Sequence, residues 1–338
     1  MPSISVIIAN FNGEKFLDDC LRSLDGQTFR DFEVIVVDNG STDGSVALIQ
    51  KKFPKVRIIP LDDNKGFAAG NNVGIAASSA EFIATLNNDT IAGEDWLSAL
   101  HGAVLTDKKI GMVASKIFLG REGEVLDSAG MLIYPDGMSR QRGRGAEDRG
   151  QFDTGEEVLF PSACAALYRR GMLDEIGLFD EDFFSYCEDS DLGLRARLAG
   201  WKAVMAPRAV VRHLYSGTGG KYSEFKAFYV ERNHFWVLLK VFPWSSLLAF
   251  PFYTLWRYII QVYGLLSGRG SVARLAEEGG KLRLLRVAVR AYREALAGLP
   301  RMLMKRKAIW KAKRLSSGAY KALLKSHRIT AAELMLRD

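Results

Sequence analysis

The sequence predicts an α/β fold with a mostly parallel sheet, helices on both faces and a helical C-terminal extension. Two observations carry this prediction. Short apolar runs alternate with amphipathic stretches up to Leu105, and the pattern becomes helical from Tyr222 onward. The 338 residues can bury one large core or two ordinary ones. We therefore expect an α/β body over residues 1–221 and a helical region over residues 222–338.

The body begins with Ile4–Ile8, a nearly continuous apolar run typical of a strand buried on both faces of a parallel sheet. Three further strands are expected at Phe32–Val37, Val56–Pro60 and Phe82–Leu86. The intervening segments predict helices at Phe16–Leu24, Ser45–Phe53, Phe67–Ala77 and Glu94–Leu105. Later in the chain, Ala203–Ala206 predicts one more strand.

The pattern breaks in the segment 117–160, which is rich in Gly, Arg and acidic residues. Only Met131–Tyr134 has the character of a strand. We expect an irregular, mobile excursion here, either a flap that closes over a ligand or a disordered surface loop.

Charge is distributed unevenly. Residues 268–338 hold 18 Lys and Arg against 5 acids, whereas the rest of the chain holds 28 against 34. The basic tail follows the aromatic segment Phe242–Leu266, which Pro243, Pro251 and Arg257 interrupt. This predicts an interfacial helix pair on an anionic membrane rather than a spanning helix; helices folded back on the body are the alternative. Because the tryptophans precede the charge run, we expect lipid rather than nucleic acid as the tail's partner.

The three cysteines, Cys20, Cys164 and Cys187, are odd in number and widely spaced, which favours reduced thiols. No charged lead-in precedes Ile4–Ala9, so we expect no signal peptide. These features predict a cytoplasmic protein attached peripherally to the inner face of the bacterial cell membrane.

Polar residues gather where the predicted strands end. Asn10, Asp38 and Asn88 each follow an apolar strand, and the carboxyl ends of parallel strands meet at one edge of a sheet. A carboxylate such as Asp38 can accept the imide N–H of uracil or thymine, although it is also an ordinary turn residue. No GxGxxG follows an early strand, which counts against a dinucleotide-dependent oxidoreductase.

The acidic stretch Phe183–Asp191 places carboxylates among aromatic residues. Such carboxylates have raised proton affinity or bind a cation, which suggests acid–base or metal chemistry. Capping of the helix that ends at Gly200 explains Asp189 and Ser190 equally well, and Asp191 is expected at the helix start.

The motifs VIIANFNG, VVDNGSTDGS, NKGFAAGNNVG, LNNDT and FSYCEDSDL, in this order, resemble those of the inverting family 2 glycosyltransferases. The resemblance is strongest to the bacterial rhamnosyltransferase-like branch of surface polysaccharide synthesis and covers roughly residues 3–240. It implies a GT-A fold with a Rossmann-like sheet, a UDP- or dTDP-sugar donor and a divalent cation, Mg or Mn.

Residue by residue, the resemblance implies Asp189 as the catalytic base and Glu188 as an acceptor-binding residue. It implies Asp89 and His213 as metal ligands, with Asn87 replacing the first acid of the family's metal motif. It assigns the donor to Ala9, Asn10, Asp38, Lys65, Gly66, Gly70, Asn71 and Asn88. Arg232 and Asn233 match a recurrent pair whose role the sequence does not reveal.

The expected activity is transfer of a sugar, such as L-rhamnose from dTDP-rhamnose, onto a hydroxyl of a lipid-linked glycan. A nucleotidyltransferase is the alternative enzyme class. It would carry a basic phosphate-binding loop after its first strand, and no basic residue follows that strand before Lys15.

Overall fold

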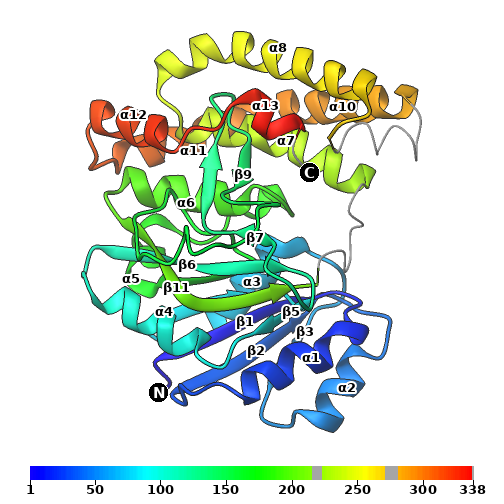
Figure 1. The fold of residues 1–338 in the computed structure, drawn as a ribbon, viewed down its shortest axis with the longest axis vertical. Coiled ribbons are helices and arrows are strands. Elements are labelled where there is room, and N and C mark those ends of the chain that lie inside the picture. Colours follow the sequence, from blue (N-terminus) through cyan, green and yellow to red (C-terminus); the bar gives the residue numbers. More distant parts are fainter. Residues whose placement is uncertain (215–222, 271–280, 337–338) are drawn as a thin grey trace.

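The computed structural model describes residues 1–214, 223–270 and 281–336. In this part of the chain, a nine-stranded sheet has the order β3-β2-β1-β4-β10-β6-β11-β5, with β7 paired to β6 (Figure 1). Its strands are β1 (Ile4–Asn10), β2 (Phe32–Asp38), β3 (Arg57–Pro60), β4 (Phe82–Leu86), β5 (Thr90–Ala92), β6 (Ile110–Leu119), β7 (Leu126–Ser128), β10 (Ala165–Arg169) and β11 (Lys202–His213). The predicted α/β class is confirmed.

The sheet is parallel in its first half and mixed in its second. β1 pairs in parallel with β2 and β4, and β2 pairs in parallel with β3, as the sequence predicts. β10 is antiparallel to both β4 and β6, while β11 is parallel to β6 and antiparallel to β5. The amino end of β10 therefore lies at the same edge of the sheet as the carboxyl ends of β1, β2 and β4.

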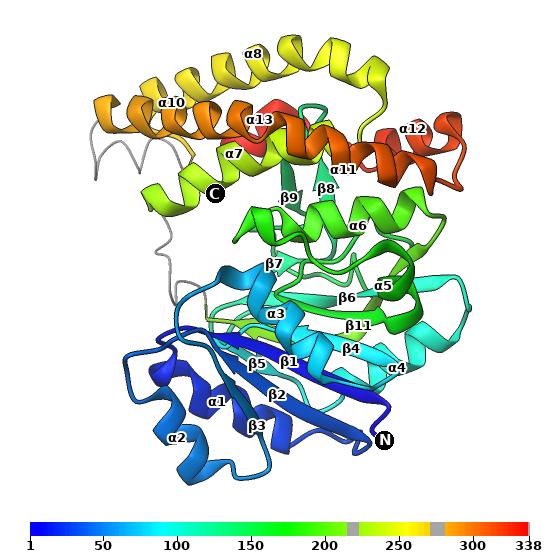
Figure 2. The ribbon, with the colours of Figure 1, turned by 180° about the vertical axis from the view of Figure 1, so that it is seen from behind.

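Helices cover both faces of the sheet (Figure 2). On one face lie α1 (Glu14–Asp25), α2 (Ser45–Lys52) and α4 (Trp96–Leu105), whose apolar residues share one core with the strands. On the other face lie α3 (Gly66–Ala77), α5 (Arg170–Ile176) and α6 (Glu188–Leu198), which belong to a second, larger core. The four helices predicted before Leu105 are all present.

The structure corrects the expectation that residues 117–160 are irregular. β6 and β7 pair inside this segment, and β8 (Met131–Ile133) pairs with β9 (Ser139–Gln141) as a hairpin. Leu126, Met131 and Tyr134 are buried. The hairpin rises from the sheet to the C-terminal helices, where Ile133 exchanges backbone hydrogen bonds with His327 and Ile329 (Figure 1). The segment therefore connects the sheet to the C-terminal region.

The C-terminal region is a helical layer stacked on α6 (Figure 1). Its helices are α7 (Glu224–Val241), α8 (Trp244–Ser267), α10 (Lys281–Ala297), α11 (Leu299–Lys311), α12 (Ser317–Ser326) and α13 (Ala331–Leu336). Trp236, Met302 and Tyr320 belong to the same core as the sheet residues, so these helices fold on the body. The expected boundary between residues 221 and 222 lies outside the described residues.

The expected pair of helices over Phe242–Leu266 is wrong, because α8 is one helix that continues through Pro251. Proline removes one backbone donor and bends a helix, but a long helix can absorb that loss. None of the helices in the described ranges has the combination of length and apolarity that crossing a bilayer requires.

Candidate active site

Three polar side chains from different strand ends form a continuous chain of hydrogen bonds. Asn88, just after β4, donates from Nδ2 to Oδ1 of Asn10 over 2.8 Å. Asn10, the last residue of β1, donates from Nδ2 to Oδ1 of Asp38 over 2.9 Å. The parallel register pairs Asn10 with Asp38 at the ends of β1 and β2. The structure thus confirms that these residues meet at one edge of the sheet.

Asp38 itself is 3% exposed and also accepts hydrogen bonds within its own turn. Ser41 donates from Oγ to Oδ1 over 2.6 Å and from its backbone N–H to Oδ2 over 3.0 Å. Asp38 therefore closes the turn and faces the strand-end network at the same time. A carboxylate held this firmly is prepositioned to accept a further donor from a ligand.

Two glycines let α3 approach this edge closely. A Cβ added at Gly70 would lie 3.1 Å from Cβ of Ala9 and 2.6 Å from Nδ2 of Asn39, so only glycine fits between these groups. Gly66 has φ +87° and lies against the carbonyl of Phe184, where any larger residue would clash. Lys65, directly before α3, is exposed and pairs with Asp63 at 2.6 Å.

Several oxygens at this edge are buried without a hydrogen-bond donor among the described residues. They are Oδ1 of Asn39, Oδ1 of Asn71 and Oδ1 of Asn87. A buried acceptor without a donor destabilises the fold by about 1–3 kcal/mol. Asn39 follows β2, Asn71 lies in α3 and Asn87 follows β4, so a polar ligand or water at this edge of the sheet can supply the missing donors.

Asp89 and His213 come together because β11 pairs with β5, which places His213 opposite Thr90. Nε2 of His213 lies 3.3 Å from Oδ1 of Asp89. Two ligands at right angles on a cation with bonds of about 2.1–2.3 Å would be separated by about 3.0–3.3 Å, so this spacing fits a divalent cation. Among the described residues no three His, Cys, Asp or Glu side chains form a metal cluster, so any cation here would need oxygens from its substrate.

Asp127 is a residue of this site that the sequence did not reveal. Its Oδ2 lies 2.8 Å from Nδ1 of His213, and Arg144 binds its other oxygen. A carboxylate on the second ring nitrogen fixes the tautomer that leaves Nε2 available as a ligand. Burial opposes the charged imidazolium, yet Cys164, Asp127 and Asp89 together hold the pKa of His213 well above its ordinary value, so a cation would have to displace the proton on Nε2.

The loop before Asp189 has an uncommon backbone conformation. After η1 (Glu181–Phe183), three non-glycine residues have positive φ: Phe184 at 62°, Tyr186 at 67° and Cys187 at 65°. Each such residue costs of order 1–3 kcal/mol and persists only when its surroundings stabilise it. The loop therefore requires an external support.

That support comes from Arg232 and Asn233 of α7. Nδ2 of Asn233 donates to the carbonyls of Phe183, Ser185 and Tyr186 over 2.9, 2.9 and 2.7 Å. Arg232 donates from Nε to Oδ1 of Asn233 over 2.9 Å, and from Nη2 to the carbonyl of Phe183 over 3.0 Å. The shape of this loop thus depends on two side chains contributed by the C-terminal region.

Asp189 lies in the first turn of α6, which begins at Glu188 and not after Asp189 as expected. Its Oδ1 accepts the backbone N–H of Ser190 over 2.7 Å. Its Oδ2 accepts the backbone N–H of Ala163 over 3.4 Å. The backbone carbonyl of Cys164, the residue after Ala163, accepts the N–H of Asn87 over 2.8 Å. Asp189 is therefore tied, through the start of β10, to the edge that carries Asp89.

The two adjacent carboxyl groups have different surroundings. Burial raises the pKa of Asp189, and the donors Ser190 and Ala163 oppose that rise. Burial and the neighbouring charge of Asp189 raise the pKa of Glu188 well above its ordinary value. Glu188 is 6% exposed, and its Oε2 has no hydrogen-bond partner in the described ranges. The pKa of Glu188 is thus raised by both burial and the charge of Asp189, whereas hydrogen-bond donors partly offset the effect of burial on Asp189.

Asp191 lies in the first turn of α6, as the sequence predicts, and its carboxylate also has structural partners. It is fully buried and bonded to Arg195 at 2.8 Å and to Lys240 of α7 at 2.6 Å. Lys240 also contacts Asp180 at 2.6 Å. Asp191 is therefore part of a buried ion network that joins α6 to α7.

Comparison with known proteins identifies the family of the chain. Residues 5–177 match the model of the family "Glycosyl transferase family 2". The N-acetylglucosaminyl-diphospho-decaprenol L-rhamnosyltransferase of Mycobacterium tuberculosis is 30% identical over 241 residues, which cover 64% of this chain and 78% of the relative. The poly-beta-1,6-N-acetyl-D-glucosamine synthase of Staphylococcus aureus is 23% identical, covering 78% of this chain and 64% of the relative.

Solved structures share the fold. The S. aureus TarS 1–349 structure superposes with a TM-score of 0.55 at 17% identity, over 96% of this chain and 91% of that one. GalNAc-T7, solved with UDP, GalNAc and Mn²⁺, has a TM-score of 0.58 at 15% identity, over 71% and 48% of the two chains. The chain thus belongs to glycosyl transferase family 2 and is a glycosyltransferase with the GT-A fold.

Proposed function

We propose that this enzyme transfers a sugar, with inversion, from a UDP- or dTDP-sugar to a hydroxyl of a lipid-linked glycan in surface polysaccharide synthesis. The observation that carries the proposal is the position of Asp189, a buried carboxylate held at the edge of the sheet that carries Asp38 and Asp89. L-Rhamnose from dTDP-rhamnose is the proposed donor sugar, because the mycobacterial relative bears the name of an L-rhamnosyltransferase.

The proposed chemistry needs one base. Asp189 takes the proton of the acceptor hydroxyl while that oxygen attacks the anomeric carbon from the side opposite the diphosphate, whose bond to the sugar breaks. Glu188, whose pKa burial and the charge of Asp189 raise, holds the acceptor through a hydrogen bond. The different surroundings of these two carboxyl groups support this division of roles.

The donor is proposed to lie along the strand-end network. Asp38 and Asn10 pair with the uracil or thymine imide, beside Ala9 and Gly70. Buried oxygens of Asn71 and Asn87 supply acceptors nearby. Lys65, Gly66 and Asn88 complete the proposed donor-binding set; Lys65 would have to leave its exposed pair with Asp63 to reach a phosphate.

Asp89 and His213 are proposed to hold a divalent cation, Mg or Mn, together with diphosphate oxygens. When bound, such a cation offsets the negative charge that develops on the departing diphosphate. Asp127 orients His213 for this role through the hydrogen bond to Nδ1. The spacing of Asp89 and His213 supports this assignment.

The acceptor and the basic tail suggest that the enzyme works at the inner face of the cell membrane. One face of α8 exposes Leu248, Phe252, Leu255, Ile259, Val262 and Leu266, each at least 49% exposed and spaced four and three residues apart. We call these six residues the outer stripe. On the opposite face, Arg257 forms a fully buried ion pair with Asp136 at 2.7 Å, which fixes the rotation of α8. An exposed apolar stripe on a firmly anchored helix fits a lipid surface.

Asp189→Asn should lower kcat roughly 10²–10⁴-fold, because the amide cannot accept the proton. Glu188→Gln, which resembles the neutral acid, should lower it far less. As the pH is lowered, wild-type activity should fall at a pH above the ordinary pKa range of aspartate. The reason is that only ionised Asp189 is active and burial raises its pKa. The assay measures transfer from dTDP-rhamnose or UDP-sugars onto a polyprenyl-diphosphate-linked sugar. Undiminished turnover by the Asp189→Asn variant would show that Asp189 is not the base.

Asp127→Asn should weaken cation binding roughly 10–100-fold, because His213 loses the partner that fixes its tautomer. The measurement is Mn²⁺ binding, followed by electron paramagnetic resonance in the presence of UDP or dTDP. The control is Asp148→Asn, since Asp148 lies in the same segment but pairs with Lys116 at 2.7 Å. Equal Mn²⁺ affinity in the two variants would argue against the proposed cation site.

Asn233→Ala should lower kcat roughly tenfold to a hundredfold, because a small displacement of a catalytic group is costly. The control is Leu238→Ala on the same helix, a fully buried residue whose loss should destabilise the fold by about 2–5 kcal/mol without touching the loop. Below the melting temperatures of both proteins, Leu238→Ala should retain kcat. A matching loss of kcat in both variants would mean that general destabilisation, and not the loop, is responsible.

Replacing Leu248, Phe252 and Leu255 with serine should reduce binding to anionic vesicles roughly a hundredfold or more, because three large apolar side chains no longer leave water. Leu105→Ser serves as a control, since Leu105 is 57% exposed but lies at the end of α4. Vesicle flotation gives the readout. Unchanged flotation of the triple variant would rule out the outer stripe as the membrane contact.

A further inference from the structure

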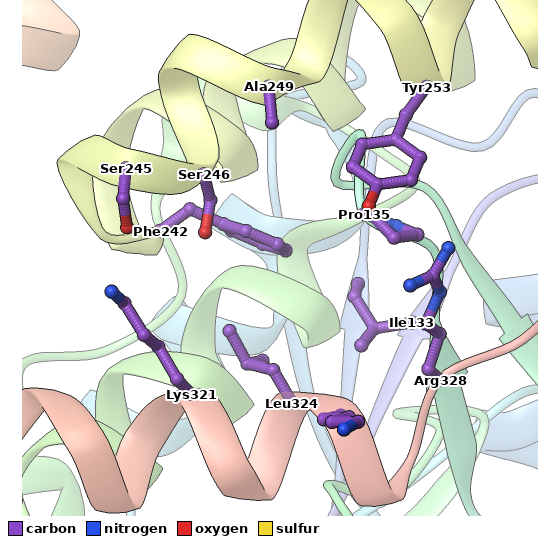
Figure 3. Close-up of a pocket in the computed structure, with 11 residues that line it drawn as sticks. Ile133, Pro135, Phe242, Ser245, Ser246, Ala249, Tyr253, Lys321, Leu324 and Arg328 are labelled. Carbon is purple, nitrogen blue, oxygen red and sulfur yellow. The ribbon is translucent and has the colours of Figure 1, made fainter.

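A pocket of about 290 Å³ lies between the start of α8, α12 and the tip of the β8–β9 hairpin (Figure 3). None of the residues that line it belongs to the candidate active site. Its lining residues are Ile133, Pro135, Phe242, Ser245, Ser246, Ala249, Tyr253, Lys321, Leu324, Lys325 and Arg328.

Three cations line this pocket without a counter-charge. Lys321, Lys325 and Arg328 follow one another at the spacing of one helix face, along α12 and just beyond its end. Within the described ranges, no carboxylate lies within ion-pair distance of any of them, whereas the buried cations Lys240 and Arg257 both have acidic partners. Three positive charges along one pocket wall, with no acid within ion-pair distance among the described residues, attract an anion.

The rest of the pocket is amphipathic. Ile133, Phe242 and Leu324 supply apolar walls, and Ser245 and Ser246 on the first turn of α8 turn their hydroxyl groups toward Lys321 and Phe242 (Figure 3). Hydroxyl and cationic groups over an apolar wall suit a ligand with an anionic head and an apolar body. A small hydrophilic anion alone would leave these apolar walls without a partner.

The pocket also adjoins the outer stripe of α8. Ala249 and Tyr253 line the pocket, while their sequence neighbours Leu248 and Phe252 are 81% and 75% exposed on the outer stripe. The ion pair between Arg257 and Asp136 fixes the rotation of α8, and therefore the orientation of both its pocket face and its outer stripe. A ligand whose head occupies the pocket can therefore extend its apolar part along the exposed residues of α8.

We propose that this pocket binds the phosphate head group of an anionic phospholipid, while the outer stripe contacts its acyl region. The inference rests on the membrane contact suggested under the proposed function and adds a specific lipid site to it. The apolar walls and the adjoining stripe favour a lipid over a nucleic acid. Arg328, stacked on the ring of Tyr253 at 5.0 Å, positions one of the three charges at the rim.

The test compares flotation on vesicles of phosphatidylcholine alone with vesicles that also contain phosphatidylglycerol. The pocket variant is Lys321→Gln/Lys325→Gln/Arg328→Gln, in the full chain. The control, Arg293→Gln/Lys307→Gln/Lys311→Gln, removes the same charge from exposed positions of α10 and α11. Melting temperature and circular dichroism establish that both variants are folded.

We expect the pocket variant to bind phosphatidylglycerol vesicles at least roughly tenfold more weakly than the control, since each cation near an anionic surface contributes severalfold. Equal binding by the two variants would overturn the proposal. Inorganic phosphate and a single-stranded oligonucleotide are tested as other ligands by the melting temperature. If either one raises the melting temperature of the wild type but not of the pocket variant, while both variants float equally, the pocket binds that anion and not a lipid. Flotation involves neither donor nor acceptor, so its failure would leave the proposed sugar transfer untouched.

Discussion

The active site depends on the hydrogen bonds from Asn233 and Arg232 to the loop that precedes Asp189. Three residues of this loop have positive φ, and a loop of this kind does not keep its shape alone. One amide group satisfies three of its carbonyls, and the guanidinium of Arg232 orients that amide. The position of Asp189 relative to the sheet is therefore set by a helix that comes after the sheet in sequence.

Buried charge reinforces the same connection. Asp191 and Asp180 share Lys240 of α7, and Asp180 and Asp182 bind Lys305 of α11. Burial works against the charged form of Asp180, but Lys240 and Lys305 hold its pKa far below the ordinary value. Removing one member of such a network would leave a buried charge unpaired, at a cost of several kcal/mol. The C-terminal helices thus complete the catalytic body as well as offering the exposed face of α8.

The sequence predicted the first half of the sheet well because local periodicity determines it. β1 to β4 and their helices lie where the apolar patterns indicate, and Asn10, Asp38 and Asn88 meet as expected. Asp89 and His213 were predicted through a family resemblance, and the antiparallel pairing of β11 with β5 brings them together. Asp127 was missed because β7 is only three residues long and pairs outside any local pattern. The role of Asn233 could not be predicted from the sequence either, since its three partners are backbone carbonyls some 47–50 residues away.

Helix α7 holds the loop before Asp189 in its observed shape through Asn233 and Arg232. Amide hydrogen exchange measured across residues 183–190, in the wild type and in Asn233→Ala, tests it directly. We expect faster exchange in this loop in the variant, with little change in β1, β2 and β4. Identical exchange of the loop in the two proteins would contradict it.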